Sequence, residues 1–132
     1  MSTLTVLDVG NCDHDHRMIR SVLTPFKVRV LRAAGEREAL EALRSEPVTL
    51  VLVNRQLDID SSKGVDLILK LKADPAATSA RFMLISNFDW AQAEAVAVGA
   101  VPGFGKDDIA TGRAADVLTP LLTRSPVSPP VA

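Results

Sequence analysis

Five short apolar runs alternate with segments of helical periodicity along nearly the whole chain. The runs occupy residues 4–9, 28–31, 48–53, 81–86 and 101–104, and a helical pattern follows each of them. A helix between two strands is the usual connection of a parallel sheet, and such connections are right-handed. The order therefore predicts an α/β fold, a (βα)5 doubly wound parallel five-stranded sheet.

The strand ends are where function is expected. The run at 48–53 is apolar on both faces, which is typical of a central parallel strand covered by helices on each side. In a doubly wound sheet of this size, the chemistry lies at the carboxyl ends of the strands. We therefore expect functional residues in the loops after Val9, Val53, Ser86 and Phe104.

Length and charge narrow the class of protein. The 132 residues fit one domain, expected at 1–122, followed by a disordered proline- and serine-rich tail at 123–132. The net charge of −1 gives no footprint for nucleic acid. No stretch has the pattern of a signal peptide or the length of a membrane span, and a single cysteine excludes an internal disulfide. We expect a cytoplasmic protein that binds neither nucleic acid nor membrane.

Four segments together carry a resemblance to a known family. They read VTLVLVN at 48–54, LKADP at 71–75, MLIS at 83–86 and GAVPGFGK at 99–106. In this order and spacing they are similar to conserved elements of the receiver (CheY-like) domain of bacterial response regulators. The resemblance covers about residues 3–122. It implies a flavodoxin-like sheet with strand order 2-1-3-4-5.

The resemblance also marks where the phosphorylation site of a receiver has changed. The position of the phosphoacceptor aspartate holds Asn54, and an amide is a poor nucleophile. The two positions of the magnesium-binding acids hold Gly10 and Asn11 in a gapless match, with Asp8 as the nearest acid. Magnesium prefers carboxylate oxygens, so we expect its binding to be weak or absent, and we expect no other cofactor.

Two phosphoryl-binding positions of a receiver are kept, as Ser86 and Lys106. The resemblance implies that the serine would donate a hydrogen bond to a phosphoryl group and the lysine would add a positive charge. Without a phosphoryl group, we expect Lys106 to hydrogen-bond Asn54 or to pair with Asp8.

The aromatic switch position of a receiver, three residues before the lysine, holds Gly103. Phe104 is one residue away and is expected to face the core. The proline that usually follows the lysine is replaced by Asp107, and the loop at 55–63 is about two residues longer than usual.

These changes together predict a degenerate receiver, a stand-alone signalling module of a two-component phosphorelay that works without phosphorylation. We expect no enzymatic activity. The expected partners are signalling proteins that contact the fourth helix, the fifth strand and the last helix. Trp90 and Phe88, at the start of the fourth helix, are candidate contact residues, and Phe104 is a third. We expect a monomer or a weak homodimer.

Two other functions stay open. One is a receiver that accepts phosphate on a non-standard acid, Asp8 or Asp58. The other is a doubly wound domain that binds a small anion between Ser86 and Lys106.

Two clusters of polar residues have an ordinary interpretation beside a functional one. Cys12, His14 and His16 offer soft metal ligands, but their spacing matches no common zinc site, so we interpret them as residues of a loop and a helix start. The loop at 58–63 faintly resembles a calcium loop without its glutamate. We interpret it as a polar loop before the third helix, with Asp58 or Asp60 as minor candidates to replace a missing carboxylate.

Overall fold

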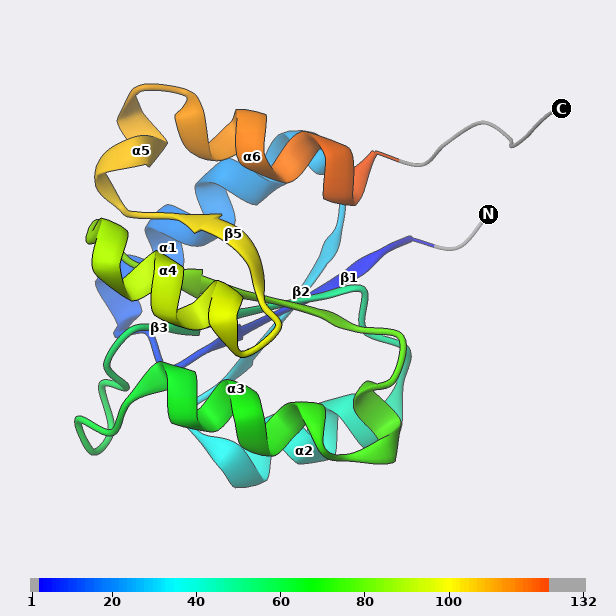
Figure 1. The fold of residues 1–132 in the computed structure, drawn as a ribbon. Helices are drawn as coiled ribbons and strands as arrows, with labels where there is room; N and C mark the ends of the chain where they lie inside the picture. The colour runs from blue at the N-terminus through cyan, green and yellow to red at the C-terminus, as the bar shows by residue number, and fades with distance from the viewer. Residues whose placement is uncertain (1–2, 124–132) are drawn as a thin grey trace, which may run out of the picture.

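The computed structural model describes residues 3–123, which form one parallel sheet with helices on both faces (Figure 1). The strands are β1 (Thr5–Val9), β2 (Arg29–Ala33), β3 (Leu50–Asn54), β4 (Arg81–Ile85) and β5 (Val101–Phe104). Their spatial order is β2-β1-β3-β4-β5, and every neighbouring pair is parallel. The predicted fold class and strand order are confirmed. The predicted tail lies outside the described residues from position 124 onward.

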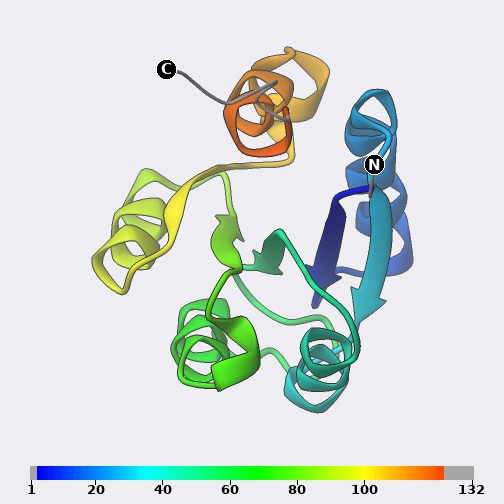
Figure 2. The same cartoon turned by 90° about the vertical axis from the view of Figure 1, so that its right-hand side faces the viewer.

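The helices form two layers, one on each face of the sheet (Figure 2). One layer consists of α2 (Glu36–Ser45), α3 (Gly64–Lys72) and α4 (Asp89–Ala97), and the other of α1 (Asp13–Leu23) and α6 (Arg113–Leu122). Three single-turn or nearly single-turn elements complete the order: η1 (Thr24–Phe26), η2 (Pro75–Ala77) and α5 (Asp107–Ala110). None of the helices between residues 3 and 123 is long and apolar enough to cross a membrane.

The residues of β3 show how the core is built. Val51 and Val53 pack in the cluster beneath α2, α3 and α4, whereas Leu50 and Leu52 pack in the cluster beneath α1 and α6. Side chains of a strand alternate between faces, so a strand covered on both sides must be apolar at every position. This explains the unbroken apolar run that the sequence shows at 50–53.

The last helical region differs from its prediction. The sequence pattern predicts one helix over 111–122, but the structure has the short α5 first and begins α6 at Arg113. Gly112 separates the two helices and has a φ of +85°, a left-handed conformation that glycine adopts without strain. Pro120 lies in the second half of α6, as the sequence indicates.

A register shift between β4 and β5 places the segment that carries Lys106. Val101 pairs with Met83 and Phe104 with Ile85, so three steps along β5 match two steps along β4. Such an extra residue is a β-bulge and re-aims the side chains beyond it. As a result Phe104 points into the core, and the chain leaves the sheet at Gly105 toward the carboxyl ends of β1 and β3.

Candidate functional site

The carboxyl ends of β3, β4 and β5 enclose the predicted site. Asn54 ends β3, Ser86 follows β4, and Lys106 follows β5. All three line one open cavity of about 230 Å³, together with Arg55, Gln56, Ile85, Asn87 and Phe88. The three residues predicted at the strand ends therefore line the same cavity.

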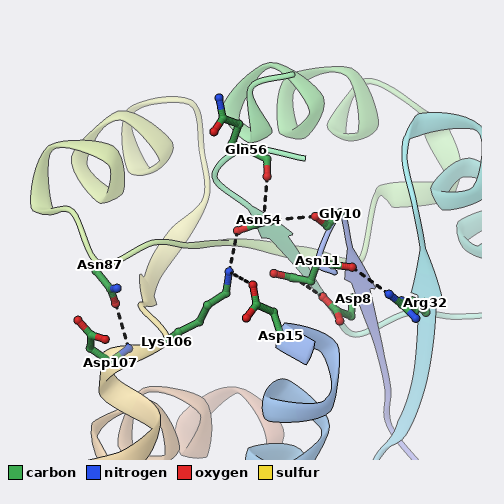
Figure 3. A network of polar contacts seen from close by, with 10 residues as sticks. All are labelled: Asp8, Gly10, Asn11, Asp15, Arg32, Asn54, Gln56, Asn87, Lys106 and Asp107. Carbon is green, nitrogen blue, oxygen red and sulfur yellow. Dashed lines mark hydrogen bonds and ion pairs between the residues drawn. The ribbon is translucent and has the colours of Figure 1, made fainter. Parts of the chain in front are cut away.

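The ammonium group of Lys106 is held by two oxygen atoms of the protein (Figure 3). Its Nζ donates to Asn54 Oδ1 at 3.3 Å and forms an ion pair with Asp15 Oδ2 at 2.8 Å. The predicted hydrogen bond to Asn54 is confirmed. The alternative pairing of Lys106 with Asp8 is wrong, because the carboxylate comes from Asp15 in the first turn of α1.

The side-chain amide of Asn54 is oriented by hydrogen bonds to two backbone carbonyl groups. Its Nδ2 donates to Gln56 O at 2.8 Å and to Gly10 O at 3.3 Å. With both amide protons directed at carbonyl oxygens, Oδ1 is left facing Lys106, and this network assigns the orientation of the amide. Asn54 thus joins the ends of β1, β3 and β5 without bringing a charge of its own.

Asp15 is the functional residue that sequence reasoning missed. Burial acts to raise the pKa of this carboxyl, but the hydrogen bond and the positive charge of Lys106 outweigh burial and hold the pKa below its usual value. Asp13 and Asp15 follow Gly10 and Asn11 in the sequence, which favours either aspartate as the N-cap of the first helix. That expectation is wrong, because the N-cap residue is Cys12, whose side chain makes no capping hydrogen bond. The order of β1 and α1 places the first turn of α1 near the strand ends, but it does not tell which side chain of that turn faces Lys106.

Asp8 lies below the site, in the middle of β1. Its side chain is fully buried on the face covered by α1, and its carboxylate accepts from Asn11 Nδ2 at 2.6 Å. The other oxygen lies 2.5 Å from Nδ1 of His16, a residue of α1. A buried carboxylate needs donors of this kind. Asp8 is therefore used inside the structure and does not reach the cavity.

Gly10 and Asn11, the two positions after β1, have structural partners. Gly10 has a φ of +80°, and a Cβ there would meet the Leu57 side chain at 2.3 Å. Asn11 is buried, and its backbone oxygen accepts from Arg32 at 3.0 Å. Its Oδ1 has no hydrogen-bond partner among residues 3–123. Neither position supplies a carboxylate, and the place between Asn54 and Asp15 is taken by the ammonium of Lys106.

The loop after β4 is tied to the loop after β5. Ser86 Oγ accepts from the backbone N–H of Phe88 at 3.1 Å, and Asn87 Oδ1 accepts from the N–H of Asp107 at 3.1 Å. Gly105 lies directly against Asn87, where a Cβ would come within 1.8 Å of Oδ1. Both side chains accept in these two hydrogen bonds, and neither the Ser86 hydroxyl nor the Asn87 amide group donates to another of the described residues.

The two polar clusters of the sequence analysis do not converge on this cavity. In the described part of the chain, no three His, Cys, Asp or Glu side chains gather closely enough to hold a metal ion. Asp60 accepts from the N–H of Ser62 at 2.9 Å, so it orders its own loop. Asp58 is exposed and lines a neighbouring hollow with Arg32 and Glu38. The partner of Lys106 is Asp15 rather than either loop aspartate.

Comparison with known proteins identifies the fold. No protein-family model matches the chain, and no curated protein matches its sequence. Solved structures do match. A response regulator from Thermotoga maritima is 21% identical, with a TM-score of 0.70 over 89% of this chain and 99% of that chain. The fold is that of receiver domains.

Two further structures agree. A CheY-like receiver domain from Methylobacillus flagellatus is 19% identical, with a TM-score of 0.64 over 79% of this chain and 85% of that one. A response regulator from Burkholderia pseudomallei is 20% identical, with a TM-score of 0.68 over 92% of this chain and 68% of that one. That structure holds a phosphorylated aspartic acid, a calcium ion and citrate. Identities of 19–21% establish a common fold alone.

Gly103, at the position that the resemblance assigns to the aromatic switch, has no room for a side chain. The N–H of Gly103 donates to Gln92 Oε1 at 2.9 Å, and Gln92 Nε2 donates to Leu84 O at 2.9 Å and Ser86 O at 3.2 Å. A Cβ at Gly103 would come within 2.2 Å of Leu84 O. The Gln92 side chain thereby fixes α4 to both β4 and β5, and there is no room for a side chain at Gly103.

The candidate contact residues divide into exposed and buried ones. Phe88 and Trp90 are 48% and 59% exposed, and their rings stack with centroids 5.7 Å apart. Phe104 is only 1% exposed and packs in the core with α6, as its expected orientation implies. The prediction that Phe104 contacts a partner protein is therefore wrong, because its side chain is buried in the core.

Proposed function

We propose that this protein is a receiver-like signalling module of a two-component phosphorelay that works without phosphorylation and acts through contacts with other signalling proteins. The observation that carries the proposal is the position of Lys106, whose ammonium is bound by Asn54 and Asp15. In a phosphorylated receiver, the resemblance implies, this lysine binds the phosphoryl group.

The chemistry at the end of β3 supports the absence of phosphoryl transfer. An aspartyl phosphate forms when a carboxylate attacks a phosphodonor, with a magnesium ion to neutralise the developing charge. Asn54 offers an amide instead of a carboxylate, and Gly10 and Asn11 offer no carboxylate for the metal. We accordingly propose no cofactor and no enzymatic activity, and we place the protein in the cytoplasm.

The fixed position of α4 supports a constant signalling state. Gln92 binds three backbone groups of β4, β5 and the loop after β4, so α4 is held to the sheet whatever the state of Asn54. An allosteric switch requires an element with two arrangements of similar free energy. A helix held in this way presents one arrangement, and the proposed contact surface is the side of α4, β5 and α6.

Incubation with a small phosphodonor and magnesium, followed by intact-mass measurement, tests the proposal. The wild type is expected to gain no phosphoryl group. Asn54→Asp is measured in parallel, and a gain by this variant alone would assign the loss to position 54. A receiver that keeps its aspartate serves as the control for the phosphodonor. Modification of the wild type would overturn the proposal, and mapping would then examine Asp58 first. The buried position of Asp8 disfavours it as an acceptor.

A further inference from the structure

Arg55 is the least exposed of the arginines in residues 3–123. Its guanidinium lies 5.1 Å from the ring centroid of Phe88 and 5.8 Å from that of Trp90. No carboxylate within this described range lies within 4 Å of it. The other described arginines either have a carboxylate partner or are exposed, so that water can solvate them. A partly buried cation without a counter-ion is costly, so the environment of Arg55 favours an anion from outside.

The cavity beside Arg55 has the donors that a carboxylate requires. None of its eight lining residues is acidic. Lys106 is already neutralised by Asp15, so Arg55 contributes the single uncompensated charge. The Ser86 hydroxyl and the Asn87 amide also line the cavity, and both retain protons to donate. Guanidinium, hydroxyl and amide donors in one cavity suit a singly charged carboxylate.

The rim of the cavity is apolar and exposed. Phe88 and Trp90 are two of the five large hydrophobic side chains that are exposed in the described part of the chain, and they lie stacked next to Arg55. Exposed aromatic side chains beside an arginine are typical of sites where a protein partner binds. A small inorganic anion would fill the cavity but leave these rings in water.

We propose that the cavity and the Arg55–Phe88–Trp90 rim dock an acidic-apolar segment of a partner protein. A glutamate or aspartate side chain enters the cavity, and a neighbouring apolar side chain covers the two rings. The proposal rests on the proposed function, since it identifies the contact through which the module signals. It concerns a site of non-covalent recognition and includes no phosphoryl transfer.

A peptide titration of the full chain tests the proposal. The sequence has one tryptophan and no tyrosine, so Trp90 reports directly on the rim. The probes are acetyl-Phe-Glu-Leu-amide and acetyl-Phe-Gln-Leu-amide, read by tryptophan fluorescence and by backbone amide chemical shifts. We expect the glutamate peptide to bind with a Kd of about 1 mM and about tenfold tighter than the glutamine peptide. Added salt should weaken the difference.

Two variants decide whether Arg55 is responsible. Arg55→Gln is expected to remove the tenfold preference for the glutamate peptide. Arg81→Gln is the matched control, because Arg81 is exposed at the opposite end of β4 and should leave the preference unchanged. Urea unfolding of both variants checks that neither has lost the fold.

Four results would overturn the docking proposal. Three of them are equal affinity for the two peptides, a preference that survives Arg55→Gln, and no binding by either readout. Acetate and inorganic phosphate are titrated in parallel. Binding of either as tightly as the glutamate peptide would also overturn it, in favour of a site for a free small anion. The phosphodonor experiment is independent of these titrations, so failure of docking and failure of the proposed function give different results.

Discussion

Two neighbouring regions at the same edge of the sheet differ in whether their charged side chains have partners of opposite charge. The paired region consists of Asp8, Asn11, Asp15, His16 and Lys106, and its charged groups contact one another. The open region consists of Arg55, Phe88 and Trp90, and its cation lies over two aromatic rings with no carboxylate within 4 Å among the described residues. Both regions border the same cavity, through Lys106 on one side and Arg55 on the other. The difference indicates that the first region maintains the structure and the second is available for binding.

The comparison also separates the two meanings of a charged residue near a strand end. Lys106 occupies the position that the receiver resemblance assigns to phosphoryl binding, yet its charge is compensated by Asp15. Arg55 has no counterpart in the motifs that carry the resemblance, yet among the residues that line the cavity it is the cation without a carboxylate partner. Position within a motif therefore predicts the location of the site better than it predicts which charge remains free.

The largest expected effect comes from breaking the interior of the paired region. His16→Ala removes one of the two donors to Asp8, whose side chain is fully buried. Removing this partner leaves one oxygen of a fully buried carboxyl group without a hydrogen bond, and we expect a loss of about 3 kcal/mol in the free energy of unfolding. Urea denaturation measures it. His14→Ala, two residues away and exposed, should change stability by less than about 0.5 kcal/mol. Equal effects of the two changes would contradict the assigned role of His16.

A smaller loss of stability is expected from a change at the contact between β5 and α4. Gly103→Ala would place a Cβ 2.2 Å from Leu84 O and 3.0 Å from Gln92 Oε1, so β5 or α4 must move. Overpacking of this kind costs about 1–3 kcal/mol. The fluorescence of Trp90 should change as well, since it lies on α4. The control is Gly35→Ala, whose Cβ would meet its nearest side-chain atom at 3.9 Å. If Gly103→Ala were as stable as the control, Gln92 would not hold α4 in place.

The comparison between the two cations is sharpened by one matched pair of substitutions. Lys106→Met leaves Asp15 and Asn54 without their shared donor, and we expect a loss of about 1–2 kcal/mol. Arg55→Met keeps an apolar side chain beside the rings and breaks no ion pair, so its effect on unfolding should stay within about 0.5 kcal/mol. Urea denaturation of both variants measures the contrast. Equal losses would mean that the open region also maintains the structure.

Most of the fold can be predicted from the sequence because the buried faces of each helix and strand must be apolar, and this produces the pattern of apolar residues. The strand at Leu50–Asn54 is covered on both faces, and its unbroken apolar run shows this directly. Asn54, Ser86 and Lys106 could be predicted as neighbours because parallel strands bring their carboxyl ends to one edge. A glycine after the pattern of the fourth helix predicts a left-handed residue at the end of that helix, and Gly99 has a φ of +102°.

The counter-ion of Lys106 could not be predicted in the same way. Asp8 is closer in sequence to the strand end, but the alternation along β1 directs it beneath α1, toward His16. Asp15 reaches Lys106 only because α1 starts at Asp13. An error of one residue in the predicted start of the helix would change the direction expected for the Asp15 side chain by about 100°. The bulge in β5 was equally hidden, because it depends on the register of Val101 and Phe104 against β4 and not on either residue type.

The smallest expected effect is a pH dependence within the paired region. The pKa of Asp15 is held below its usual value, because the interaction with Lys106 outweighs the opposing effect of burial. A carboxyl whose pKa is lowered by folding stabilises the protein above its unfolded pKa, about 3.9, and this contribution is lost as the pH falls through the lower folded pKa. At pH 7 we expect Asp15→Asn to cost up to about 1 kcal/mol, since the pair is partly exposed.

The wild type and Asp15→Asn should therefore converge in stability as the pH is lowered from about 5 to about 3. Urea denaturation of both proteins at each pH measures the difference between them. The comparison is needed because Asp13, Asp60 and Asp74 also have lowered pKa values and weaken the wild type in acid for their own reasons. Those residues are present in both proteins, so their contribution cancels. A difference that stayed constant down to pH 3 would show that Asp15 stabilises the fold by its shape rather than by its charge, and the paired region would then have to be redefined without the Lys106 ion pair.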